Sequence, residues 1–81
     1  MDKPIWATRL KELRLSRGLT QREVVELLAR KGVETSKSSV SKWENGTHET
    51  GNYALRVLAD YYDVSIDWIF GREKNGQENK L

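Results

Sequence analysis

A serine-rich segment in the middle of the chain carries the residue types best suited to recognising another molecule. Residues 37–42 read Lys-Ser-Ser-Val-Ser-Lys, and within residues 37–45 only Val40 and Trp43 are large and apolar. Hydroxyl groups donate and accept hydrogen bonds, and ammonium groups donate them. Serine lowers helix propensity because its side chain competes for backbone hydrogen bonds. A helix of this composition therefore predicts a polar face kept for recognition.

The composition excludes most catalytic and metal chemistry. The 81 residues contain no cysteine and one histidine, which excludes disulfides, thiolate ligands, cysteine nucleophiles and two-histidine zinc sites. No nucleophile–base set is apparent, so we expect no enzyme activity and no cofactor. No apolar run reaches the ~18–20 residues that span a bilayer, and the N-terminus lacks the apolar stretch of a signal peptide. We therefore expect a cytoplasmic protein.

The net charge of +2 is small but unevenly distributed. Residues 1–31 hold eight Lys/Arg and four acidic residues, whereas residues 32–50 and 51–81 each carry a net charge of −1. A mildly basic first third is typical of a domain with one end facing phosphate. A solvated helix surface of mixed charge is the alternative.

Five helices and no strand are predicted, which gives an all-α fold. Apolar residues recur at helical spacing, and capping residues or glycines mark the helix ends. The expected helices cover residues 6–17, 21–31, 37–45, 52–62 and 66–70. Thr20 and Glu23 form a capping-box pattern, Ser36 or Thr35 caps the third helix, and Ser65 caps the fifth. The second helix should turn four apolar residues inward: Val24, Val25, Leu27 and Leu28.

Three segments in this order carry a family resemblance. They are RLKELRLSRGLTQR at residues 9–22, SSVSKWENG at 38–46 and LADYYDVSIDWIFG at 58–71. Together they resemble the Cro/repressor, or xenobiotic-response-element, family of helix-turn-helix DNA-binding domains, in particular phage and mobile-element repressors. The resemblance implies a compact five-helix, lambda-repressor-like domain over residues 5–71, in which helices two and three form the helix-turn-helix. Residues 72–81 then form a polar disordered tail or the start of a linker.

The resemblance also implies where DNA is contacted. The second helix of such a motif lies in the major groove with its N-terminal residues on base edges. Gln21 matches the family's phosphate-binding glutamine, placed where the N-terminus of helix two assists. The other expected DNA-binding residues are Lys37, Ser38, Ser39, Ser41 and Lys42 on the third helix, and Asn45, Thr47 and His48 at its end. For Ser41 and His48, ordinary exposed surface is the alternative.

Two further positions match a structural pair of the family. An arginine late in helix one pairs with the glutamate that follows the aromatic residue of helix three, and Arg14 and Glu44 stand at these positions. Each follows an inward residue, so both fall at the margin of the core. A bidentate pair there would tie the third helix to the rest of the domain.

Two features depart from the family pattern. Between Gln21 and Trp43 the chain has about five more residues than the family usually has, placed around residues 28–35, where either helix two gains a turn or the turn becomes a loop. Val25 stands where the family commonly has alanine, at the close contact of the two helices. Both features bear on how the third helix is presented.

The sequence therefore predicts a sequence-specific double-stranded DNA-binding transcriptional regulator, bacterial or phage-encoded and nucleoid-associated. We expect a repressor that binds a palindromic operator as a homodimer. The alternative is an antitoxin or regulatory adaptor of the same fold whose main task is to hold a protein partner. Apolar residues near the chain ends supply either a dimer surface or simple closure of the core: Trp6, Tyr61, Trp68, Ile69 and Phe70.

Overall fold

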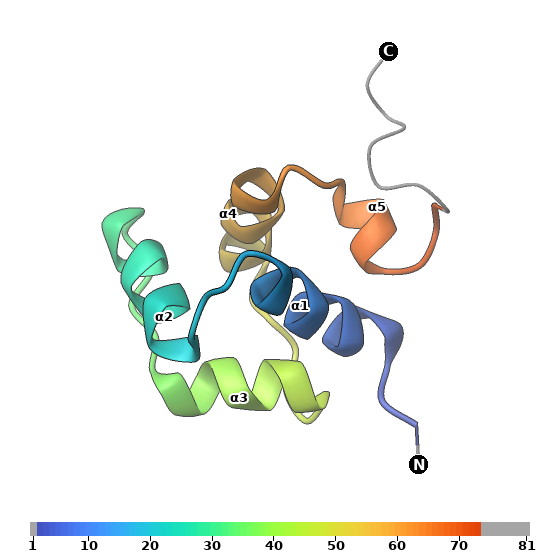
Figure 1. The fold of residues 1–81 in the computed structure, drawn as a ribbon, viewed down its shortest axis with the longest axis horizontal. Helices are drawn as coiled ribbons and strands as arrows, with labels where there is room; N and C mark the ends of the chain where they lie inside the picture. The colour runs from blue at the N-terminus through green and yellow to red at the C-terminus, as the bar shows by residue number, and fades with distance from the viewer. Residues whose placement is uncertain (1, 74–81) are drawn as a thin grey trace.

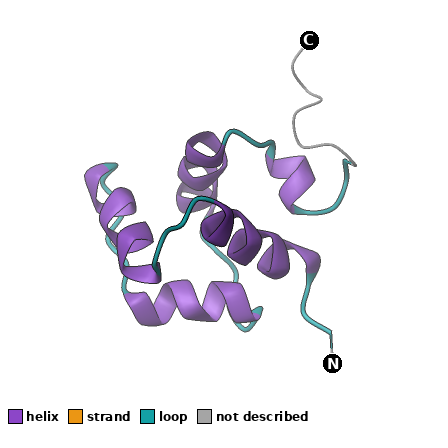
Figure 2. Ribbon diagram, in the orientation of Figure 1, coloured by secondary structure: helices purple, strands orange, loops and turns teal. Residues whose placement is uncertain are grey.

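A computed structural model describes residues 2–73 of the chain. Its five helices are α1 (Ile5–Ser16), α2 (Gln21–Arg30), α3 (Lys37–Asn45), α4 (Asn52–Tyr62) and α5 (Ile66–Ile69) (Figure 1). The described part of the chain contains no strand, so the all-α prediction is confirmed (Figure 2). The predicted tail lies mostly outside this range, since residues 74–81 are not described.

The predicted helix boundaries differ from the observed ones by at most one residue, because the expected caps form. Thr20 Oγ1 accepts a hydrogen bond from the Glu23 N–H, and Glu23 Oε1 accepts one from the Thr20 N–H at 2.8 Å, which completes the capping box. Of the two candidates for the third helix, Ser36 is the cap, and its Oγ accepts from the Ser39 N–H. The predicted ends of α1, α2 and α5 are each one residue too late, because the residue there is the C-cap and not the last helical residue.

The extra residues between α2 and α3 are divided between helix and loop. Residues 28–30 form the last turn of α2, and residues 31–35 lie in the connection. Gly32 ends the helix with φ +84°, a left-handed conformation that favours glycine. The Val33 N–H then donates to the Leu28 carbonyl at 2.9 Å and the Gly32 N–H to the Ala29 carbonyl at 3.0 Å. This pattern is a Schellman motif, and it ends α2 before the chain turns back to α3.

One hydrophobic core joins all five helices. Tyr62, Leu28, Ile69 and Val40 are its largest fully buried side chains. α1 and α2 both pack against α3, and α5 packs against α1 and α4. Val25, expected to point inward, is only half-buried. It follows Val24 by one residue, about 100° further round the helix, and so lies at the margin of the apolar stripe.

The apolar residues near the chain ends divide between core and surface. Ile69 is fully buried, and Trp6 and Trp68 are half-buried against the core, whereas Tyr61 and Phe70 are exposed. The Arg9 guanidinium lies over the Trp68 ring, 4.2 Å from its centroid, and also donates to the Trp68 carbonyl. Core closure therefore accounts for three of the five residues. Within residues 2–73, no helix combines the length and apolar character that a membrane span requires.

Candidate DNA interface

The outer face of α3 is polar and unobstructed. Figure 1 shows α3 along one edge of the fold, with α1 and α2 next to it and α4 and α5 beyond them. Its inner side buries Val40, Trp43 and Glu44. Its outer side exposes Lys37, Ser38, Lys42 and Asn45. The helix therefore presents two ammonium groups, a hydroxyl and an amide to the outside, while its apolar residues hold it in place.

Two of the expected contact residues are less accessible than the others. Ser39 and Ser41 are both half-buried. Ser39 Oγ also accepts a hydrogen bond from Ser36 Oγ at 3.2 Å, so part of its capacity serves the N-terminus of the helix. The polar residues of α3 therefore fall into two groups. Lys37, Ser38 and Lys42 are exposed, whereas Ser39 and Ser41 lie at the margin of the polar face and are half-buried.

The segment that follows α3 is held in place at its start. Gly46 has φ +81°, and a Cβ added there would lie 2.5 Å from Pro4 Cδ, so the backbone approaches the start of α1 closely. Thr47 Oγ1 donates to the Lys42 carbonyl at 3.3 Å. The side chains of Asn45, Thr47 and His48 are all exposed. These three residues therefore form a continuous exposed edge at the C-terminal end of α3.

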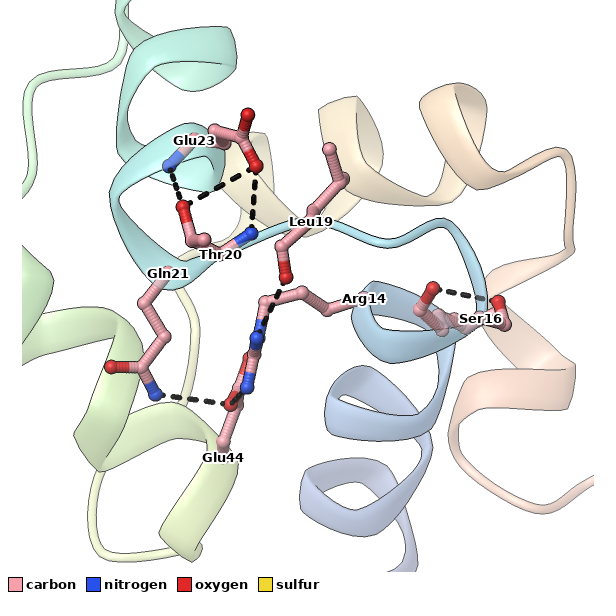
Figure 3. A network of polar contacts seen from close by, with 8 residues as sticks. Arg14, Ser16, Leu19, Thr20, Gln21, Glu23 and Glu44 are labelled. Carbon is pink, nitrogen blue, oxygen red and sulfur yellow. Dashed lines mark hydrogen bonds and ion pairs between the residues drawn. The ribbon is translucent and has the colours of Figure 1, made fainter.

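Arg14, Gln21 and Glu44 meet in one network (Figure 3). Arg14 Nε donates to Glu44 Oε2 at 2.7 Å and Arg14 Nη2 donates to Glu44 Oε1 at 2.9 Å, a bidentate pair. Arg14 Nη1 also donates to the Leu19 carbonyl at 2.8 Å. Arg14 is 8% exposed and Glu44 5%. The hydrogen bond to Glu44 raises the pKa of Arg14, and this effect outweighs the lowering that burial causes. The pair joins α1 and the α1–α2 turn to α3.

The same carboxylate orients Gln21. Gln21 Nε2 donates to Glu44 Oε1 at 3.1 Å, so the amide nitrogen points toward α3 (Figure 3). An amide NH₂ group has two hydrogens, and the second remains for another acceptor. The family resemblance implies only a phosphate contact for Gln21. The structure adds a contact with the buried ion pair, which ties its orientation to α3.

A shallow hollow opens beside Gln21, between the α1–α2 turn and the start of α3. It is lined by Thr20, Gln21, Arg22 and Lys37, among others. Within residues 2–73, no hydrogen bond engages the backbone N–H groups of Gln21 and Arg22, which lie at the positive end of α2. Arg22 is exposed, and it is not among the contact residues that the sequence predicts. Its signal was its place beside Gln21 in the basic first third of the chain.

Comparisons with known proteins identify the family of the chain. A helix-turn-helix family model matches residues 10–69. The chain is 29% identical over 66 residues, 82% of its length, to the HTH-type transcriptional activator BcrR of Enterococcus faecalis, of which the match covers 30%. It is 29% identical over 72 residues, 89% of its length, to the HTH-type transcriptional regulator ImmR of Bacillus subtilis strain 168, of which the match covers 53%. The chain thus spans about a third to a half of these relatives. No solved structure matches it.

Both relatives carry the names of HTH-type transcriptional regulators. The family model covers most of the chain and includes α2, α3 and the connection between them. This protein therefore belongs to the helix-turn-helix family of DNA-binding transcriptional regulators, of the Cro/repressor type.

Proposed function

We propose that the protein binds a specific operator in double-stranded DNA through the outer face of α3 and represses transcription. The observation that carries this proposal is the division of α3. Its inner side is anchored by Val40, Trp43 and the Arg14–Glu44 pair, and its outer side exposes polar side chains. A helix that lies in the major groove needs both properties, a fixed orientation and free donors and acceptors.

Each expected contact residue has a role within this proposal. Lys37, Ser38 and Lys42 point outward from α3 and contact base edges or phosphates. Ser39 and Ser41 lie at the margin and make closer, secondary contacts with the groove wall. Asn45, Thr47 and His48 contact the DNA backbone at the end of the helix.

Gln21 and Arg22 are proposed to bind one phosphate of the operator. Gln21 and Arg22 both line the same hollow. The Gln21 amide keeps one N–H hydrogen beside its bond to Glu44, and the backbone N–H groups of both residues have no partner in the described part of the chain. Hydrogen bonds to phosphate set the position of a protein on the duplex and carry no sequence information themselves. The Gln21–Glu44 bond supports this proposal, because it couples the phosphate contact to the helix that reads the bases.

We further propose that two copies bind a palindromic operator. In two-fold symmetric complexes of this motif, the half-sites lie one helical turn, about 34–36 Å, apart on one face of the DNA. Exposed apolar side chains on α1 and α4 and at the end of α5 are available for an isologous contact: Ile5, Leu15, Tyr53, Tyr61 and Phe70. Repression then follows from occupancy alone, since a dimer that covers a promoter excludes polymerase.

Selection of random duplexes by the protein tests this function. A palindromic consensus is expected, and a reporter promoter overlapping that sequence should lose activity when the protein is present. One relative is named an activator. A reporter that rises instead would contradict repression and leave operator binding intact. Absence of any selected sequence at low salt would refute the DNA-binding proposal altogether.

Three variants test the assigned roles on the selected operator. Lys42→Ala should change the preferred sequence, with a loss of about 1–3 kcal/mol at the affected base. Gln21→Ala should weaken binding to all duplexes about equally, because it removes a phosphate contact. Lys31→Ala is the control for the charge lost in Lys42→Ala, because Lys31 is the C-cap of α2 and is not assigned to the DNA interface. The C-terminal end of α2 lies away from α3 (Figure 1). If Gln21→Ala shifts the consensus, Gln21 acts on base reading through its bond to Glu44 and α3, and the assignment of its role to phosphate alone is wrong.

A further inference from the structure

A groove of about 480 Å³ lies between α2 and α4, on a part of the fold that the proposed DNA interface does not use. The least exposed residues that line it are apolar, since Leu27 of α2 is buried and Val57 of α4 is half-buried. Two tyrosines of α4 also line it, Tyr53 with 57% of its surface exposed and Tyr61 with 47%. Tyr53, Val57 and Tyr61 are four residues apart, so they form one apolar stripe on α4, about 12 Å long.

Cations border this groove on both helices. Arg30 and Lys31 lie at the C-terminal end of α2, and Arg56 lies on α4. Asp60 is the one acidic residue among the described residues that line the groove. All four are exposed, and none of them takes part in the ion pairs found within residues 2–73. Three cations and one carboxylate, none of them engaged in an ion pair, therefore surround the apolar stripe.

One end of the groove is held in a fixed shape. Tyr53 Oη donates to the Lys31 carbonyl at 3.2 Å, which joins α4 to the C-cap of α2. The Lys31 N–H in turn donates to the Leu28 carbonyl at 2.9 Å. A surface whose shape is already fixed loses less conformational freedom when it binds a partner.

The charges favour a protein segment over a nucleic acid. Each nucleotide carries a negative phosphate, which the Asp60 carboxylate would repel. A protein segment can place carboxylates opposite the three cations and a neutral or basic side chain opposite Asp60. Tyrosine and arginine are also enriched among the residues that contribute most to protein–protein affinity.

This chain itself complements the groove less well. Residues 74–81 hold two lysines and one glutamate, so their net charge has the same sign as that of the groove. In an isologous contact between two such grooves, the same cations would face each other. Ile5 and Phe70 belong to a different patch, since a Cβ added at Gly71 would lie 3.1 Å from Ile5 Cδ1. They remain available for a contact between two copies.

We propose that the groove between α2 and α4 binds an acidic segment of a partner protein. Apolar side chains of this segment pack on the α4 stripe, its carboxylates pair with the three cations, and a neutral or basic side chain faces Asp60. The proposal goes beyond DNA binding and does not rest on it, because no residue of the groove is assigned to the DNA interface. The C-terminal end of α2 lies away from α3 (Figure 1), so the partner and the DNA approach different sides of the domain.

Selection from a phage-displayed library of random peptides, with the full chain as bait, tests the proposal in the absence of DNA. We expect a consensus that combines several Asp or Glu residues with an aromatic or large aliphatic residue. A synthetic peptide of this sequence should bind with a Kd at or below about 100 µM, measured by fluorescence anisotropy. The same peptide with Asn and Gln in place of Asp and Glu should bind at least about tenfold more weakly, because it keeps the apolar contacts and loses the charges.

Two pairs of substitutions locate the carboxylates of the peptide. Arg30→Gln combined with Arg56→Gln should weaken the peptide roughly tenfold, because it removes two of the three cations. Lys37→Gln combined with Lys42→Gln removes the same charge from α3 and should leave the affinity unchanged. All four side chains are exposed, so these variants should fold, which far-UV circular dichroism checks.

A second comparison locates the apolar contact. Tyr61→Ser should weaken the peptide at least about tenfold, as expected for an aromatic anchor of an interface. Leu15→Ser is the control, because Leu15 is a similarly exposed apolar residue on α1 and does not line the groove.

Four results would overturn the proposal. The first is a selection that enriches no sequence, or a consensus without Asp or Glu. The second is an equal loss of affinity in the α3 control pair, which would place the acidic peptide on the DNA interface. The third is displacement of the peptide by mixed-sequence single-stranded DNA in the wild type and in the α3 control pair alike, which would show that the groove prefers a nucleic acid. The fourth is a dimer of the free chain that Tyr61→Ser dissociates in sedimentation experiments, which would show that a second copy fills the groove.

Discussion

The buried pair between Arg14 and Glu44 allows the most quantitative test of how this domain is held together. Each residue is at most 8% exposed, and together they connect α1 to α3 through two hydrogen bonds of 2.7 and 2.9 Å. We consider three variants: Arg14→Met, Glu44→Met and the double substitution. Methionine approximates the length of both side chains and carries no charge, so each single variant leaves the other charge buried without its partner.

The expected magnitudes follow from what remains bonded in each variant. In Glu44→Met, the Arg14 guanidinium keeps the Leu19 carbonyl as its acceptor. In Arg14→Met, the Glu44 carboxylate keeps the amide of Gln21. Losing one member of a buried pair costs about 3–5 kcal/mol, whereas replacing both by apolar residues is often close to neutral. A domain of this size has a total unfolding free energy of about 4–11 kcal/mol. Each single variant should therefore lose a large part of its stability.

Urea unfolding followed by far-UV circular dichroism measures these differences. The midpoint and slope give the free energy of unfolding in water. The double variant should be more stable than either single variant. Two single losses of about 3–5 kcal/mol against a nearly neutral double variant give a coupling energy of about 6 kcal/mol or more, above the about 0.5–3 kcal/mol usual for residues in contact. The exposed pair between Arg72 and Asp67, 3.3 Å apart and more than half exposed, is the control. Asp67→Ala should change the stability by no more than about 1 kcal/mol through this pair.

Additive effects would refute this reasoning. If the two single variants each cost less than about 1 kcal/mol and the double variant costs their sum, Arg14 and Glu44 act as independent solvated charges. A double variant that is less stable than both single variants would show that the ion pair contributes more to the free energy of unfolding than two methionines do. In that case the desolvation cost assigned to the two charges is too high.

Three smaller predictions concern single positions. Burial raises the pKa of Tyr62 from 10.0 to about 12. Between these two pH values the phenol is ionised in the unfolded chain but still protonated in the folded one. The free energy of unfolding should therefore fall by up to about 1.4 kcal/mol per pH unit as the pH rises through this interval. Tyr62→Phe should remove this part of the alkaline slope, and an unchanged slope would contradict the assignment. Asp63 ends α4 with φ 59°, so Asp63→Gly should raise the urea midpoint, with a gain in stability of about 0.5–1 kcal/mol. A lowered midpoint would contradict the assignment of strain to this residue. Gly46→Ala should lower the free energy of unfolding more than Gly32→Ala does. Both glycines have a positive φ, which costs about 1–2 kcal/mol for alanine, but only at Gly46 would the new Cβ also lie 2.5 Å from Pro4 Cδ. Equal losses in the two variants would exclude a role for the contact with Pro4.

Local signals in the sequence predict the helices well. The Thr20–Glu23 capping box, the Ser36 and Ser65 caps and the glycines after the helices all lie within a few residues of the ends that they define. Asp63 is the exception, since it adopts the left-handed conformation that sequence reasoning assigns first to glycine. The Val64 N–H donates to the Ala59 carbonyl at 3.1 Å and the Asp63 N–H to the Asp60 carbonyl at 3.2 Å. Aspartate, one of the few residues other than glycine that visit this conformation, therefore ends α4 in the place that glycine usually takes.

Exposure along α3 was harder to predict. Helical periodicity indicates which side of α3 carries Val40 and Trp43. It places all the serines on the opposite, polar side and does not predict any difference in their exposure. In the structure Ser38 is exposed, while Ser39 and Ser41 are half-buried. How far a neighbouring helix covers the margin of a polar face depends on packing distance, which no pattern along a single helix contains.

The sequence by itself determined five helices, the anchored and the polar side of α3, and the residue types available for binding DNA. These follow from local backbone preferences and from the period of the apolar residues. Only the tertiary structure decided that Glu44 Oε1 accepts hydrogen bonds from both Arg14 and Gln21, residues 30 and 23 positions away in the chain. It also decided that Arg30, Tyr53 and Tyr61 border one groove. Side chains from separate elements meet only where the packing of the core places them, because chain entropy opposes such contacts until the whole domain has folded.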